Sequence, residues 1–118
     1  MKESIVQNKS FKFSLKIIAL YKKLKEEKEF IISKQLLRSG TSIGANIEEA
    51  LAGQSKRDFI AKTSISSKEA RETKYWLRLL KESNIINIDV TEVLSDVHEL
   101  IRLLTAIVKT SQQSLTKN

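Results

Sequence analysis

The chain contains no cysteine, no proline and a single histidine, His98, among its 118 residues. Without cysteine it forms no disulfide and has neither a thiolate nucleophile nor a thiolate metal ligand. One histidine is too few for a histidine-based zinc site within one chain. Turns are rich in proline and glycine, yet there are only three glycines. Their scarcity argues against all-β and α/β folds and favours a few long helices with short links.

Long apolar runs are also missing. The N-terminus lacks the continuous apolar stretch of a signal peptide, and no segment approaches the roughly 18 apolar residues of a membrane span. We therefore expect a soluble cytoplasmic protein with no membrane partner. The phosphate-loop motif G-x-x-x-x-G-K-[ST] and the Glu-x-x-His motif of di-iron centres are absent. The sequence thus predicts no cofactor, no metal and no catalytic residue.

The residues that are present recur with helical spacing, at alternating intervals of three and four. The helical segments span residues 4–27, 30–52, 56–83 and 90–110, and a frayed tail is expected over residues 111–118. Ser55 is suited to cap the third helix, and either Asp89 or Thr91 the fourth. Four helices with short links predict one all-α domain over residues 1–118, an antiparallel up-down-up-down four-helix bundle.

The apolar surface of these helices is wider than one bundle core requires. In the first helix, Phe11, Leu15 and Ile18 form a stripe beside the one that begins at Phe13 and Ile17. The third and fourth helices carry further apolar residues outside their heptad positions, namely Ile60, Ile65, Trp76, Leu79, Ile101 and Val108. A monomer would expose several of these residues, so we expect a symmetric homo-oligomer.

A row of polar residues follows one side of the second helix: Gln35, Arg38, Ser42, Asn46 and Glu49. Two interpretations are open. In the first, these residues form a structural hydrogen-bonded seam that fixes the register of the helices, which we favour. In the second, Arg38 clamps an anion and Glu49 acts as a base, but no second titratable group stands near Glu49 in the sequence.

The same helix carries Gly40 and Gly44 at the spacing that lets helix backbones approach closely. Each glycine costs about 1 kcal/mol relative to alanine inside a helix, so a compensating gain in packing is expected. In the third helix, Tyr75 and Trp76 are adjacent aromatic residues beside Arg78. They either stack on nucleic-acid bases or, as we favour for Trp76, close the end of the bundle or fill a subunit interface.

The net charge of +7 is unevenly distributed. Residues 1–34 carry nine lysines and four glutamates, or +5; residues 35–84 contribute +3, and residues 85–118 contribute −1. This asymmetry is typical of a polyanion-binding face, although a solvated lysine-rich surface would look the same. The candidate nucleic-acid contacts are Lys9, Lys12, Lys16, Lys22, Lys23, Lys56, Arg57, Lys62 and Arg78.

Several segments resemble the family of 23S rRNA intervening-sequence proteins. The matching residues are 35–39 (QLLRS), 42–49 (SIGANIEE), 55–59 (SKRDF) and 68–77 (KEARETKYWL). Ile31 and Ala50 stand where the family often has proline and glycine. The resemblance implies a four-helix bundle that assembles into a ring-like homopentamer without enzymatic activity.

The resemblance leaves two functions open. A related bundle, the accessory protein of diversity-generating retroelements, is a basic pentamer that engages a reverse transcriptase and nucleic acid. By analogy, five copies of this chain would carry +35 and bind RNA or DNA without sequence specificity. The alternative is an adaptor that binds a protein partner and no nucleic acid.

Overall fold

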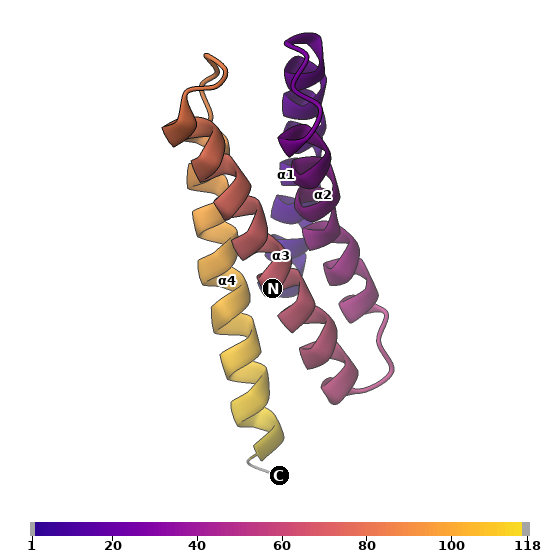
Figure 1. Cartoon of the computed structure of the whole chain (residues 1–118). Coiled ribbons are helices and arrows are strands. Elements are labelled where there is room, and N and C mark those ends of the chain that lie inside the picture. Colours follow the sequence, from indigo (N-terminus) through magenta and orange to yellow (C-terminus); the bar gives the residue numbers. More distant parts are fainter. Residues whose placement is uncertain (1, 117–118) are drawn as a thin grey trace.

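Four α-helices make up nearly all of the computed structural model, which describes residues 2–116. They are α1 (Lys2–Glu26), α2 (Ile32–Leu51), α3 (Lys56–Ser83) and α4 (Thr91–Thr116), and these residues contain no strand. The predicted all-α four-helix class is confirmed. The molecule measures 52 × 22 × 21 Å, and the α1–α2 and α3–α4 links lie at the end opposite the α2–α3 link (Figure 1).

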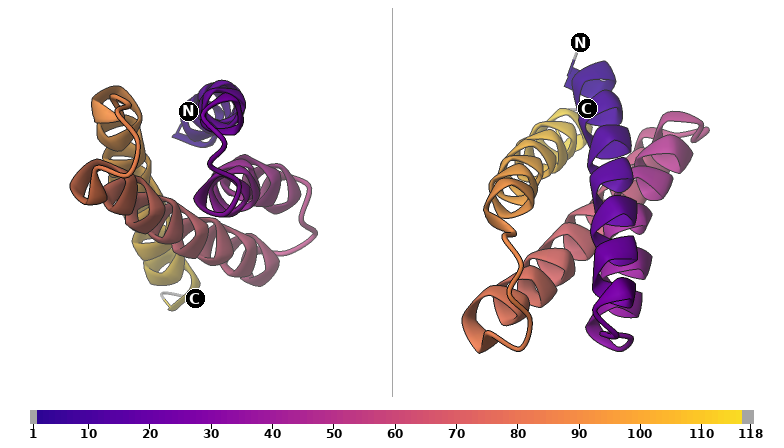
Figure 2. Two further views of the ribbon diagram at one scale, coloured as in Figure 1. Left: turned by 45° about the horizontal axis from the view of Figure 1, so that its top comes forward. Right: turned by 90° about the horizontal axis from the view of Figure 1, so that it is seen from above.

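Neighbouring helices run in opposite directions around a shared core (Figure 2). Each of α1, α2, α3 and α4 packs against two others, and within the described residues α1 does not contact α3. Ile17, Leu36, Leu77 and Leu104 supply one fully buried side chain from each helix. The predicted heptad positions are buried, apart from Ile32, Phe59 and Val93 at the helix ends, which are half-buried. 

The first helix buries only half of its apolar surface. Phe13 and Ile17 lie in the core, whereas Phe11, Leu15 and Ile18 are exposed. The buried and exposed stripes are on different sides of the helix because successive residues are rotated by about 100°. The chain therefore displays a large apolar surface on the outside of α1.

The three links are short and held by hydrogen bonds. Glu29 precedes α2 and accepts hydrogen bonds from the backbone N–H groups of Ile31, Ile32 and Ser33 at 3.1, 3.0 and 2.7 Å. Ser55 caps α3 through the N–H of Asp58, as its position in the sequence indicates. The α2–α3 and α1–α2 links are therefore ordered by capping side chains.

The fourth helix begins as expected and ends later than expected. Asp89 accepts a hydrogen bond from the N–H of Thr91 at 2.9 Å, which makes Asp89 the capping residue. The predicted frayed tail is wrong for residues 111–116, because α4 continues to Thr116. These turns lie along the start of α3, where Lys56 donates to Ser114 at 2.6 Å. The rest of the predicted tail, residues 117–118, lies outside the described residues.

Candidate nucleic-acid interface

Two of the candidate lysines on α1 face α4 and are engaged in ion pairs. Lys9 lies 3.2 Å from Glu99, and Lys16 lies 2.6 Å from Glu92 and 2.8 Å from Asp96. The hydrogen bonds to Asp96 and then Glu92 raise the pKa of Lys16 to about 12. These lysines hold α1 against α4, so their positive charge is largely neutralised within the chain.

The other candidate cations divide into two groups. Lys62 pairs with Glu49 at 3.3 Å and Arg78 with Glu82 at 3.1 Å, while Lys56 donates to Ser114. The remaining four form no ion pair within residues 2–116: Lys12, Lys22, Lys23 and Arg57. Three of these four lie on α1 and Arg57 lies at the other end of the bundle, so the structure does not gather the predicted contacts into one surface.

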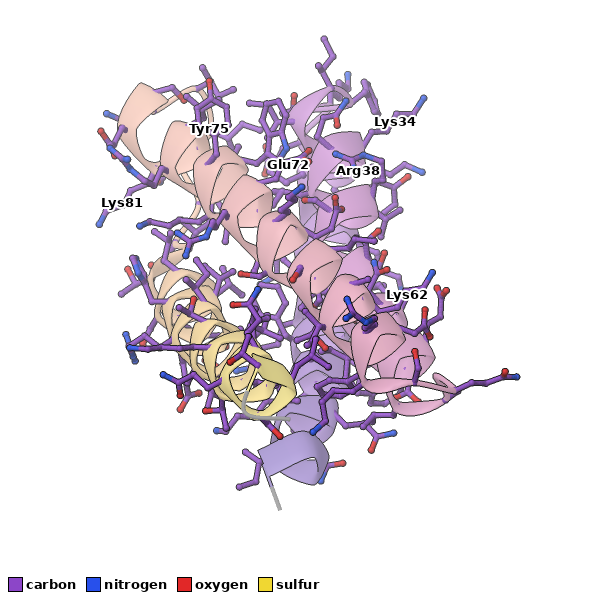
Figure 3. The ribbon with its side chains drawn as sticks, turned by 90° about the horizontal axis from the view of Figure 1, so that it is seen from below. Lys34, Arg38, Lys62, Glu72, Tyr75 and Lys81 are labelled. Carbon is purple, nitrogen blue, oxygen red and sulfur yellow. The ribbon has the colours of Figure 1, made fainter. Side chains whose placement is uncertain are left out.

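A different set of cations is gathered on α3 and α4. On α3, a row at intervals of three and four residues contains Arg71, Lys74, Arg78 and Lys81; on α4, a second row contains Arg102, Thr105 and Lys109. The two rows meet where the Arg71 guanidinium donates to the Thr105 hydroxyl at 3.4 Å. We call this surface the basic face: Arg71, Lys74, Arg78, Lys81, Arg102 and Lys109. Figure 3 shows Lys81 projecting from α3 away from the rest of the bundle.

The centre of the basic face is hollowed into a groove of about 270 Å³ between α3 and α4. Its polar lining consists of Ser64, Ser67, Arg71, Thr105, Lys109 and Gln112. All six side chains carry hydrogen-bond donors, and none carries a negative charge. A groove with this lining can bind a phosphate group by donating hydrogen bonds to its oxygens.

The fourth helix separates its charges by side. Its carboxylates Glu92, Asp96 and Glu99 face α1 and pair with lysines there, while Lys109 lines the groove on the α3 side and Arg102 falls in the same row at a spacing of three and four. The sum of −1 for residues 85–118 conceals this separation. Sequence reasoning therefore missed the basic face, although a helical projection of α4 alone would have revealed it.

One acidic residue lies at the upper end of the basic face. The pKa of Asp89 is lowered from its ordinary value, first by hydrogen bonds from Thr91 and also by the nearby charge of Lys81. Glu82 is the other carboxylate nearby, and it is paired with Arg78. Both carboxylates lie away from the groove that Arg71 and Lys109 line, where no acidic residue is present.

The predicted polar seam on α2 is only partly a link between helices. Arg38 forms ion pairs with Glu69 and Glu72 of α3. Figure 3 shows Glu72 pointing toward Arg38. Arg38 also donates to Gln35 on its own helix, and Glu49 pairs with Lys62 of α3.

The central part of the seam bonds to α2 itself. The Ser42 hydroxyl donates to the carbonyl of Arg38, and the Asn46 amide donates to the carbonyl of Ser42. The buried bonds between α2 and α3 come from the neighbouring stripe instead: Thr73 donates to Ser39 at 2.9 Å, and Ser66 to the carbonyl of Ile43 at 2.8 Å. These bonds fix the register of α2 against α3.

The two glycines of α2 both face α1. A β-carbon added to Gly40 would lie 2.8 Å from Ile17, and one added to Gly44 would lie 3.4 Å from the carbonyl oxygen of Ser10. Among residues 2–116, no group of three His, Cys, Asp or Glu side chains is arranged to hold a metal ion. No helix in this part of the chain is long and apolar enough to cross a membrane.

The fold defines a class, the small all-α four-helix proteins. The chain belongs to the 23S rRNA-intervening sequence protein family, whose family model matches residues 2–106. This finding confirms the resemblance noted from the sequence.

A solved structure of similar sequence supports the assignment. It is a protein of unknown function from the S23 ribosomal protein family of Bacteroides thetaiotaomicron, 50% identical to this chain. The similarity covers 92% of this chain and 99% of that one, with a TM-score of 0.87. No curated protein matches the sequence.

Proposed function

We propose that this protein is a non-enzymatic, homo-oligomeric scaffold, a pentamer by family resemblance, that binds the backbone of RNA or DNA through the basic face. The observation that carries the proposal is the separation of charge across α4. Its carboxylates pair with lysines of α1, whereas Lys109 joins Arg71 in the lining of a groove that contains no acidic residue. Arg102 lies one turn before Thr105, which also lines that groove. Gathering unpaired like charges costs free energy unless a polyanion is bound there.

The chemistry of the groove suits phosphate rather than bases. Phosphate oxygens accept hydrogen bonds from Arg, Lys, Ser, Thr and Gln side chains, which are the residue types that line it. Contacts of this kind position a nucleic acid without reading its sequence. Binding should therefore be independent of sequence and should weaken steeply as salt is added, because each phosphate contact releases counterions.

The ion pairs of α1 support placing the proposed contacts on the basic face rather than on α1. Lys9 and Lys16 are already paired with three carboxylates of α4, so Lys12, Lys22 and Lys23 are the candidate contacts on α1 without an ion pair in the described residues. These three provide a matched control for the basic face. They carry the same total charge as Arg71, Arg102 and Lys109. Of these six residues, only Arg71 has a polar contact within residues 2–116, the hydrogen bond that it donates to Thr105.

The test compares two triple variants in a fluorescence anisotropy titration with labelled single-stranded RNA and duplex DNA. The first is Arg71→Gln/Arg102→Gln/Lys109→Gln and the second is Lys12→Gln/Lys22→Gln/Lys23→Gln. We expect the first to reduce the slope of log K against log salt by about 2 to 3, because three phosphate contacts are lost. The second should leave the slope nearly unchanged. Equal losses in both variants would show that net charge alone matters and would contradict the basic face as the binding surface.

A protein adaptor is the second candidate, and a separate observation favours it. Phe30, Ile31 and Ile85 cluster at one end of the bundle and are 53%, 78% and 57% exposed. The backbone N–H of Ile31 donates to the Glu29 carboxylate that caps α2, which holds Ile31 in place. An ordered apolar cluster of this kind fits a protein partner. Failure of the wild-type protein to bind either nucleic acid at low salt would favour this function.

A further inference from the structure

Two exposed apolar faces lie on opposite sides of the bundle. The outer side of α1 carries Phe11, Leu15 and Ile18, which are 61%, 53% and 38% exposed and spaced by four and three residues. The outer side of α3 carries Ile65 and Tyr75, which are 42% and 56% exposed. Figure 2 (right) shows α1 in front, whereas Figure 3, seen from the other side, shows α3 in front.

The face on α1 continues into a groove of about 550 Å³ between α1 and α2. Ile18 and Leu37 provide its apolar floor, Tyr21 forms a wall, and Lys22 and Lys25 stand at the rim. Lys25 already lies over the ring of Tyr21, with its ammonium 5.2 Å from the ring centre. The groove is therefore suited to an aromatic side chain, with apolar contact below and cations at its edge.

The face on α3 presents such an aromatic side chain in a fixed position. Tyr75 packs edge-to-face against Trp76, with 5.2 Å between ring centres. The indole of Trp76 donates to Glu72 at 3.0 Å, and Glu72 is ion-paired with Arg38 of α2. This chain of contacts from α2 to Tyr75 reduces the freedom that an exposed tyrosine would lose on binding.

Contacts inside the bundle show that the two faces are level with each other. Gly44 of α2 lies against Ser10 of α1, and the preceding carbonyl of α2 accepts a hydrogen bond from Ser66 of α3. Phe11 and Ile65 are the immediate neighbours of these contacts. They therefore lie at similar heights on opposite sides of the molecule.

The spacing along the two faces also matches. Ten residues separate Phe11 from Tyr21 in the wall of the groove, and ten separate Ile65 from Tyr75. At 1.5 Å per residue, both distances along the helix axis are about 15 Å. When α1 of one copy lies parallel to α3 of another, Phe11 meets Ile65 while Tyr75 reaches the groove.

We propose that a second copy of this chain docks its α3 face onto the α1 face of the first, with Tyr75 inserted between Ile18 and Leu37. This inference rests on the oligomeric part of the proposed function and names the surfaces that would form it. Because the two faces are on opposite sides of one bundle, the contact is heterologous and repeats from copy to copy in the same direction. Arg71 of the basic row points toward α4, where it donates to Thr105, and is not one of the residues of this contact.

The absence of native cysteine allows a direct test by cross-linking. Protein carrying Phe11→Cys is mixed with protein carrying Ile65→Cys, dissociated and reassembled, and treated with a short bis-maleimide. A covalent dimer that contains one copy of each variant, with no dimer from either variant alone, would support heterologous docking. A dimer of Phe11→Cys with itself, or no dimer in the mixture, would overturn it.

A second measurement tests how much the aromatic side chain of Tyr75 contributes to the affinity of self-association. Tyr75→Ala should weaken self-association about 30-fold in sedimentation or light scattering, as truncation of a buried interface aromatic does. Leu51→Ala is the control, because Leu51 is also exposed but lies at the end of α2 and belongs to neither face. It should leave self-association unchanged. Circular dichroism verifies that both variants remain folded.

The outcomes separate this inference from the proposed function. If wild-type protein is oligomeric but Tyr75→Ala assembles as well as Leu51→Ala, the docking mode is refuted and the oligomeric scaffold stands. If wild-type protein is a monomer at all concentrations, self-docking is refuted, and the RNA titration still tests the basic face by itself.

Discussion

Replacing Gly40 and Gly44 separately by alanine should change the stability in opposite directions. The two residues lie one helical turn apart on the same helix, and both are buried against α1. In each case, alanine improves the intrinsic helix propensity by about 1 kcal/mol. What differs is the space for the new methyl group, which the neighbouring side chains of α1 determine.

At Gly40 there is no space. The added β-carbon would lie 2.8 and 2.9 Å from the two γ-carbons of Ile17, whose side chain is fully buried. Overpacking of this kind costs about 1 to 3 kcal/mol, so the net effect after the gain in propensity is a loss of about 0 to 2 kcal/mol. At Gly44 the nearest atom is the Ser10 carbonyl oxygen at 3.4 Å, an ordinary contact, so a gain of up to about 1 kcal/mol is expected.

Urea unfolding followed by circular dichroism measures both effects, with the midpoint as readout and the slope m as a check on the two-state assumption. All variants are compared at one protein concentration, so that any contribution from assembly cancels. In an Ile17→Ala background, Gly40→Ala should become stabilising, because the clash is gone and a cavity is available. If Gly40→Ala proved more stable than Gly44→Ala, the packing argument would be wrong.

Two further predictions concern ion pairs and caps. Glu29→Ala should lower the free energy of unfolding by about 1 to 2 kcal/mol, or the melting temperature by about 4 to 8 °C, because three N–H groups at the start of α2 lose their acceptor. Glu29→Gln, which retains one acceptor oxygen, should lose less. Lys16→Gln should cost less than about 1 kcal/mol at pH 9, because the lysine side chain is 42% exposed. The pKa of Lys16 is higher in the folded state, so its contribution is present below its ordinary pKa of 10.5 and is lost as the pH rises through about 12. A difference between wild type and Lys16→Gln that persists above pH 12 would contradict this assignment.

The heptad pattern was sufficient to predict the helices and most of the core. Positions such as Leu36, Ala70 and Leu104 are buried because three-and-four spacing keeps one side of each helix facing its neighbours. The same rule does not give the width of the face that one chain can bury. In α1, Phe13 and Phe11 are equally apolar, and only the positions of α2 and α4 decide that Phe13 is buried and Phe11 is not.

Features that depend on the partner helix were beyond the sequence. The row through Ser42 and Asn46 looked like the polar contact between helices, yet the buried bonds are made by Ser39 and Ser66, which the apolar stripe seemed to account for. Glu29 falls between the first two predicted helices, and its capping role could not be predicted because a glutamate cap depends on the path of the link. The basic face was not predicted because the net charge of a segment does not show on which side of a helix each charged residue lies.

The contacts between neighbouring helices differ in kind and extent, and this difference has a consequence for the motions of the bundle. The pairs α1–α2 and α2–α3 are held by close backbone approach and by buried hydrogen bonds of Ser66 and Thr73. Of the four neighbouring pairs, α1 and α4 share the fewest contacts, and ion pairs of Lys9 and Lys16 at the surface join them. Local opening costs least where little apolar surface is buried, and salt weakens exposed ion pairs. We therefore expect α4 to separate from α1 more readily than other neighbouring helices separate, with its α3 side as the hinge, and more readily still as ionic strength rises.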